Sequence, residues 1–86
     1  MVILINNGGK TLETAIVIKD CTNAEGVGAE YDFLEKEYGA RGVGWQLENQ
    51  ALIESKGRHY DELDISLKDG TKIALFFDIE EFFDKW

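Results

Sequence analysis

Apolar residues recur mostly at every second position in three runs between residues 45 and 77. Such alternation predicts strands that bury one face and expose the other. Helix propensity makes a helix the alternative for residues 45–54, but the alternation favours a strand. The expected apolar face comprises Trp45, Leu47, Ala51, Ile53, Leu63, Ile65, Leu67, Ile73, Leu75 and Phe77. On the reverse face, the apolar residues expected to interrupt a polar surface are Leu52, Tyr60 and Phe76.

The turn at Asp69-Gly70 sets the register of the last two strands. A two-residue loop would pair Ile65 with Ala74, whereas a three-residue loop with a left-handed glycine pairs Ile65 with Ile73. The three-residue loop places apolar side chains opposite each other, and a slip of one residue destroys this match. We therefore predict the three-residue loop.

The turn at Lys56-Gly57 is expected to have the same form. The pairs that it predicts are Trp45 with Leu67, Leu47 with Ile65, and Ile53 with His59. The two turns then give one continuous apolar face, and this agreement predicts an antiparallel meander of three strands.

The residues from Asp78 onward predict a helix that packs on the apolar face of the meander. Asp78 is a suitable N-cap, and Glu81 follows three residues later, as in a capping box. Apolar side chains then recur at helical spacing. They are Ile79, Phe82, Phe83 and Trp86.

The N-terminal half predicts two strands and a helix. Residues 2–5 are a short β-rich run, residues 6–9 form a turn, and residues 14–19 form a strand that is apolar on both faces, as a central strand is. Thr22 and Glu25 match a capping box, residues 26–28 predict a loose turn, and a firm helix is expected over about residues 29–38. The apolar stripe expected on this helix comprises Val27, Tyr31, Phe33, Leu34 and Tyr38.

The chain has 86 residues, which is enough for one domain. The expected fold class is a single α+β domain over residues 1–86 with the element order ββαβββα. It has a mainly antiparallel sheet of four or five strands, a C-terminal meander of three strands, and two helices packed on one face.

The net charge of −8 narrows the range of partners. Negative charge repels phosphate backbones, so nucleic-acid binding is not expected, whereas a basic protein partner is permitted and solubility is favoured. No apolar run reaches the roughly 18 residues that cross a bilayer, so no membrane association is expected. The first residues lack the basic region of a signal peptide. The single cysteine cannot form an internal disulfide, whereas small secreted domains usually have several, so the expected location is cytoplasmic.

Residues with catalytic chemistry are sparse. Cys21 and His59 are the candidates for a nucleophile and a base, but one cysteine and one histidine do not make a tetrahedral metal site. A plainer interpretation makes Cys21 a small buried hydrophobe and places His59 near a hairpin loop. Residues 26–28 lack the further glycine or the lysine of phosphate-binding loops. No metal or cofactor is therefore expected.

The predicted register places two polar residues, Asn49 and Asp61, on the apolar face. A buried carboxylate needs hydrogen-bond donors, so Asp61 is expected to accept bonds from turn or helix N–H groups. The functional alternative is that Asp61 lines a small pocket with Asn49, Tyr60 and Arg41. The candidate interface anchors, judged by residue type, are Arg41, Trp45, Arg58 and Tyr60.

Several segments of the C-terminal half carry a family resemblance. They are Arg58-His59-Tyr60-Asp61, Asp69-Gly70, Phe77-Asp78-Ile79 and Phe82-Phe83. These segments resemble the C-terminal half of a family of small bacterial proteins of unassigned function. The resemblance implies a bacterial cytoplasmic protein and carries no activity or binding site.

Three functions are consistent with these features. The first is a non-catalytic, acidic protein-interaction module, such as an accessory, immunity-type or inhibitor protein, or a homodimer. The second is a small-molecule-binding or regulatory domain with a cleft near residues 26–28 or 39–45. The third is an enzyme that uses Cys21 and His59, which the absence of any catalytic motif disfavours.

Overall fold

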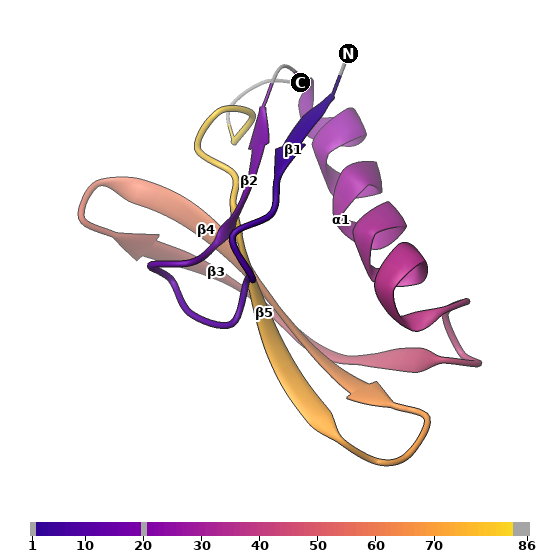
Figure 1. Ribbon diagram of the computed structural model, residues 1–86. Coiled ribbons are helices and arrows are strands. Elements are labelled where there is room, and N and C mark those ends of the chain that lie inside the picture. The colour runs from indigo at the N-terminus through magenta and orange to yellow at the C-terminus, as the bar shows by residue number, and fades with distance from the viewer. Residues whose placement is uncertain (1, 20, 84–86) are drawn as a thin grey trace.

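The computed structural model describes residues 2–19 and 21–83 of the chain. The described residues form five strands and one helix (Figure 1). The elements are β1 (Ile3–Ile5), β2 (Ile16–Lys19), α1 (Asn23–Tyr38), β3 (Trp45–Ser55), β4 (Arg58–Leu67) and β5 (Lys72–Asp78).

The strands form one mixed sheet in the order β1-β2-β5-β4-β3. Neighbouring strands are antiparallel except β2 and β5, which are parallel. Figure 1 shows α1 along one side of the twisted sheet. The predicted α+β domain with a C-terminal meander is therefore confirmed, and the doubly apolar strand β2 is an inner strand, as its pattern predicts.

The register between β4 and β5 is the predicted one. Ile65 pairs with Ile73 and Leu63 with Leu75. Gly70 has a φ of 91°, and the amide of Leu67 donates to the Thr71 carbonyl at 2.7 Å, closing the loop. Matching apolar side chains and a left-handed glycine together fix this register.

The predicted loop between β3 and β4 is wrong. Ser55 pairs with Arg58 across a two-residue loop, in which Lys56 has a φ of 52° and Gly57 a φ of 78°. Positive φ at both central positions is the geometry that matches strand twist in a tight hairpin. Ile53 consequently pairs with Tyr60 rather than with His59.

A β-bulge at Glu48 restores the predicted register further along the hairpin. Leu47 pairs with Ile65 and Asn49 with Asp64, so Glu48 has no partner residue. Beyond the bulge, Trp45 pairs with Leu67 as predicted. Because one extra residue shifts a strand by one position, the tight loop and the bulge offset each other.

The bulge changes which residues of β3 face the helix. Residues paired across strands lie on the same face of a sheet, and successive residues alternate. Leu52 therefore shares the helix face with Asp61, whereas Ala51 and Ile53 lie on the opposite face with Glu62 and Tyr60. The predicted placement of Ala51 and Ile53 on the core face is wrong.

Helix α1 begins earlier than predicted. The capping box is confirmed, since the Glu25 amide donates to Thr22 Oγ1 and the Thr22 amide donates to Glu25 Oε1 at 2.9 Å. Gly26 lies within the helix because the Phe82 ring packs against it. A Cβ built on Gly26 would lie 2.5 Å from Phe82 Cζ. Helix propensity is overridden here by a close contact with the C-terminal segment.

The predicted C-terminal helix is wrong for the described residues, which form a turn after β5. Asp78 ends β5 and forms an ion pair with Arg58 at 3.0 Å, so its carboxylate is engaged with a side chain of β4. The Ile79 amide donates to the His59 carbonyl, and the Phe82 amide to the Ile79 carbonyl. The predicted burial of Ile79 and Phe82 is confirmed, and Trp86 lies outside the described residues.

The core fills the space between α1 and one face of the sheet. Its members are Ile16, Ile18, Leu34, Trp45, Leu63, Ile65, Leu75, Phe77, Ile79 and Phe82. Tyr31 stacks on Trp45, and Phe33 meets Phe77 edge to face. In the part of the chain that the structure describes, no helix is long and apolar enough to cross a membrane.

Candidate interaction surface

The face of the sheet turned away from α1 carries apolar side chains on all five strands. We call it the open face. Its apolar members, assigned from the strand pairing, are Ile3, Ile5, Val17, Ala51, Ile53, Tyr60, Ala74 and Phe76. The sequence predicted two of these, Tyr60 and Phe76.

The open face is only partly covered. Helix α1 lies on the other side of the sheet (Figure 1), and Phe82 of the C-terminal turn packs against that helix. Ile3 and Ile5 are each 42% exposed, and Phe76 and Ile53 are half-buried. A sheet that is solvated on one face usually has polar residues there, so apolar residues on all five strands indicate a contact surface.

The open face also carries charged residues. Two of them are the basic residues Lys19 and Lys72, which pair with Ile3 and Ser66. At one end, the Arg58 guanidinium donates bidentate hydrogen bonds to the Asp78 carboxylate, at 3.1 and 3.2 Å. In the middle, Glu62 and Asp64 follow each other on β4. The hydrogen-bonding contact with Asp64 is the main cause that raises the pKa of Glu62, with burial and the charge of Asp64 adding to it. Asp64 therefore disfavours ionisation of Glu62.

A hollow of about 410 Å³ adjoins Asp64. Its lining residues are Glu48, Asn49, Asp64, Ile65, Lys72, Ile73 and Ala74. The bulged Glu48 accepts a hydrogen bond from Ser66 Oγ at 2.6 Å, which holds its carboxylate near β4. Asp64 Oδ1 is buried and has no hydrogen-bond partner within residues 2–19 and 21–83.

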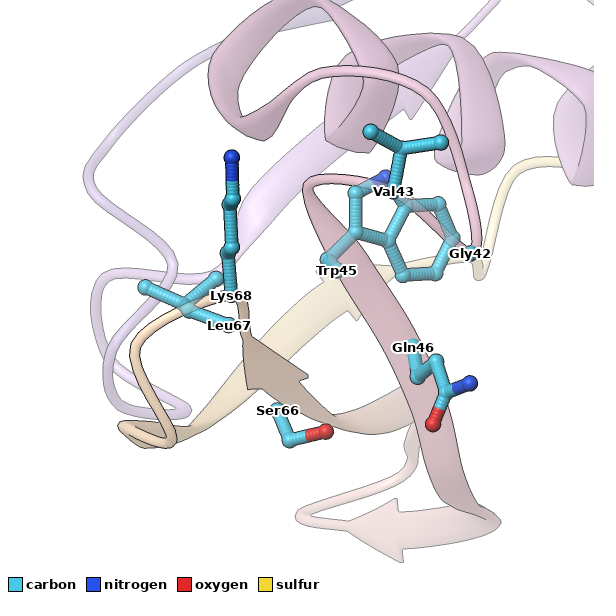
Figure 2. A pocket seen from close by; sticks show the side chains of 7 residues that line it. All are labelled: Gly42, Val43, Trp45, Gln46, Ser66, Leu67 and Lys68. Atoms are coloured by element: carbon cyan, nitrogen blue, oxygen red, sulfur yellow. The ribbon is translucent and has the colours of Figure 1, made fainter.

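A second, smaller pocket lies at the glycine-rich loop before β3. Figure 2 shows its lining side chains, which come from this loop, the start of β3 and the end of β4, and it encloses about 230 Å³. Trp45 is buried and donates from Nε1 to the Gly39 carbonyl at 2.8 Å. The Arg41 guanidinium lies 5.3 Å from the Tyr31 ring centre and 5.8 Å from that of Trp45, so cation–π contacts hold it.

Asp61 lies on the helix face, in a buried polar cluster. Gln50 Nε2 donates to both of its carboxylate oxygens, at 3.3 and 3.0 Å. Glu30 of α1 is fully buried, and neither of its carboxyl oxygens has a hydrogen-bond partner among the described residues. Burial is the main cause that raises the pKa of Glu30 to about 10, and the neighbouring Asp61 adds to it. Burial also raises the pKa of Asp61.

The structure separates the residues of the predicted Asp61 pocket. Asn49 and Tyr60 lie on the open face, Asp61 lies on the helix face, and Arg41 stacks on Tyr31 outside the strands. The predicted pairing of Asn49 with Leu63 is wrong, because the two-residue loop places Gln50 opposite Leu63. Arg41 and Trp45 are brought together, and Arg58 lies near Tyr60 through Asp78.

His59 is held by its own contacts at the end of β4. Its ring stacks on Phe83, with ring centres 3.8 Å apart, and its Nδ1 lies 2.9 Å from Glu80 Oε1. Hydrogen bonds from His59 lower the pKa of Glu80. Cys21 is half-buried. No group of three or more histidine, cysteine or acidic residues that could hold a metal occurs among the described residues.

Sequence reasoning missed four residues that the structure makes prominent. They are Glu30, Gln50, Glu62 and Asp64. Glu30 falls between apolar stripe positions of the helix, and Gln50 reaches the helix face because the two-residue loop places it opposite Leu63. The alternation in β4 does place Glu62 and Asp64 on the face of Tyr60, so that signal was present.

Comparison of the chain with protein-family models, curated proteins and solved structures found no match. The resemblance to small bacterial proteins therefore stays a prediction. The functional argument rests on the residues of this chain alone.

Proposed function

We propose that this protein is a non-catalytic protein-interaction module that binds its partner through the open face of the sheet. The observation that carries the proposal is the set of apolar side chains that all five strands present on the side of the sheet opposite α1, among which Asp78 and Glu62 also lie. This set runs from Ile3 and Ile5 at one edge to Ile53 at the other.

Burial of this surface supplies the driving force for association. Apolar area removed from water stabilises a complex by about 25 cal/mol per Å² before the costs of association. Phe76 and Tyr60 provide the aromatic area that interfaces favour, and the Arg58–Asp78 pair beside Tyr60 fixes a polar edge. Phe76 and Tyr60 are half-buried, so neighbouring residues restrict these two side chains before a partner binds.

A photo-crosslinker at Phe76 tests the proposal. The residue is replaced by p-benzoyl-phenylalanine, and the purified protein is irradiated in an extract of the source cells. The expected result is one discrete crosslinked product, which excess unlabelled wild-type protein suppresses. Mass spectrometry then identifies the captured chain, and purified partner is used to measure the dissociation constant.

The matched control carries the same crosslinker at Glu35, which is exposed on α1. This variant is expected to give no such product. Equal crosslinking from both positions would contradict the proposal, as would no product from Phe76 together with a strictly monomeric protein in sedimentation.

Binding of a small ligand at the glycine-loop pocket is a second candidate function. The wall formed by Trp45 and the positive charge of Lys68 favour it, but a volume of about 230 Å³ admits only a ligand of few atoms. A thermal-shift screen against small anions and metabolites tests it, since ligand at about 100 times its dissociation constant adds roughly 2.7 kcal/mol of stability. A ligand whose shift survives Lys68→Ala would contradict binding at this pocket.

A further inference from the structure

The acidic residues Glu62 and Asp64 each have one alanine among their two paired neighbours on the open face. Glu62 lies between Ala51 on β3 and Phe76 on β5. Asp64 lies between Asn49 on β3 and Ala74 on β5. Asp64 lines the hollow of about 410 Å³, and Glu62 lies two residues before it on the same face of β4.

One carboxyl oxygen of this hollow lacks a donor. Asp64 Oδ1 is buried without a hydrogen-bond partner among the described residues, and Glu62 is in contact with Asp64. Glu48 contributes another carboxylate from the bulge, and this one accepts a hydrogen bond from Ser66 Oγ. A buried acceptor without a donor destabilises the fold, so a cation placed here would remove an existing penalty.

The nearest basic residue of the chain does not fill this role. Lys72 lines the same hollow from β5, yet it makes no ion pair within 4.0 Å in the described structure. Lys72 pairs with Ser66, two pairs further along the ladder than Asp64 and Ala74 and on the same face. The hollow is thus acidic at one end and remains accessible from the open face.

We propose that the partner of the open face is a basic, amphipathic segment of another protein. Its apolar side chains pack on Phe76, Ala51 and Ile53, and a lysine or arginine side chain enters the hollow beside Asp64 and Glu62. This inference rests on the proposed function, and it adds the chemistry of the partner.

Charge complementarity favours such a partner over a second copy of this chain. Each copy carries a net charge of −8, so two copies repel each other at long range. A basic segment is instead attracted, and its cation replaces water beside the carboxyl groups of Asp64 and Glu62. The apolar residues of the open face around these carboxyl groups can pack against an amphipathic segment, whereas a free metal ion would leave them exposed to water.

Two synthetic peptides test the inference on the ¹⁵N-labelled protein. One alternates leucine with lysine, and the other has glutamine in place of every lysine. We expect the lysine peptide to shift the backbone amides of Ala51, Glu62 and Phe76, and to bind at least about tenfold more tightly than the glutamine peptide. The difference should shrink as salt is added, because rim charges are screened.

A pair of charge-matched variants separates the hollow from general attraction. The double variant Glu62→Gln with Asp64→Asn should weaken binding of the lysine peptide by about tenfold. The control, Glu35→Gln with Glu37→Gln, removes the same charge from exposed positions of α1 and should change binding less than about twofold. If the first variant does not fold, the two peptides on the wild-type protein decide the matter alone.

The possible outcomes distinguish this inference from the proposed function. Equal weakening by both double variants, or no shift of open-face amides by the lysine peptide, overturns the basic-partner inference. If the glutamine peptide shifts the open-face amides and binds as tightly as the lysine peptide, the basic-partner inference is overturned, but the open face remains a contact surface. If these amides shift with protein concentration in the absence of peptide, the open face binds a second copy of the chain, and the basic-partner inference is again overturned while the proposed function stands.

Discussion

The buried carboxyl group of Glu30 predicts that the protein loses stability as the pH rises. Its pKa is raised from 4.5 to about 10 by burial and by Asp61. In the folded protein Glu30 therefore keeps its proton over a pH range in which the unfolded chain has lost it. Stability from such a group is fully present below the unfolded pKa and is lost as the pH rises toward the folded one.

The magnitude follows from proton linkage. Each pH unit in this range costs about 1.4 kcal/mol, so Glu30 alone removes about 4 kcal/mol between about pH 5 and about pH 8. That is a large part of the 5–15 kcal/mol that holds a typical domain folded. Asp61, whose pKa burial also raises, acts in the same direction.

The variant Glu30→Gln isolates this contribution. Glutamine has a similar shape to glutamate and no titrating proton. The stability of the variant relative to wild type should therefore rise by about 1.4 kcal/mol per pH unit between about pH 5 and about pH 8. Urea unfolding followed by circular dichroism at several pH values gives both curves. Glu35→Gln, at an exposed position of α1, is the control and should run parallel to wild type.

Two parallel stability curves for wild type and Glu30→Gln would refute the reasoning, because they would show that Glu30 ionises in the folded protein as it does in the unfolded chain. Carboxyl groups with lowered pKa values do not affect the comparison of wild type with Glu30→Gln between about pH 5 and about pH 8. The lowered pKa values of Glu25 and Glu80 give stability that is lost only as the pH falls below about their ordinary value of 4.5.

Two further predictions concern helix α1. Gly28→Ala should stabilise the protein by about 0.5–1 kcal/mol, because its Cβ meets open space, whereas Gly26→Ala should destabilise it, because its Cβ meets the Phe82 ring; thermal unfolding of the two variants checks the difference in sign. Thr22→Ala should cost about 1 kcal/mol by removing the N-cap acceptor of the Glu25 amide, and Thr22→Ser should restore most of it in the same measurement.

The apolar side of β4 and β5 could be predicted because local rules decide it. Alternation in the strands and the left-handed Gly70 point to one register, and the structure has that register. The hairpin at Gly57 offered two compatible loops, and nothing in residues 45–55 marks the bulge. The two departures offset each other, so the pairing of Trp45 was right although the loop was wrong.

The C-terminal helix failed as a prediction because tertiary contacts compete with local signals. Asp78 Oδ1 accepts a hydrogen bond from the Glu80 amide, as an N-cap would, but its carboxylate also bonds Arg58, which is 20 residues earlier in the chain. Apolar spacing placed Ile79 and Phe82 inside correctly, since a turn buries the same side chains as a helix would. Periodicity therefore predicted burial but not conformation.

The polar sites were the least accessible to sequence reasoning. A glutamate within an amphipathic helix is normally assigned to the solvent side, and Glu30 became exceptional only when Asp61 of a distant strand was placed against it. Gln50 likewise reaches Asp61 through the register that the two-residue loop sets. Contacts between elements far apart in the sequence decide both, and no local pattern contains them.

Deletion of Glu48 tests how far the bulge governs the open face. Leu47 and Asn49 already pair with consecutive residues of β4, so removal of Glu48 leaves a regular strand with every other pair unchanged. The expected cost is about 1 kcal/mol, from the lost hydrogen bond of Ser66.

The matched control deletes Glu62 from β4. Because β4 pairs with both β3 and β5, this deletion shifts the register of half of β4 against both neighbouring strands. This variant should not fold. Nuclear Overhauser contacts of Leu47 with Ile65 in the Glu48 deletion would establish the register. Their loss would show that the bulge specifies the hairpin rather than merely absorbing one residue.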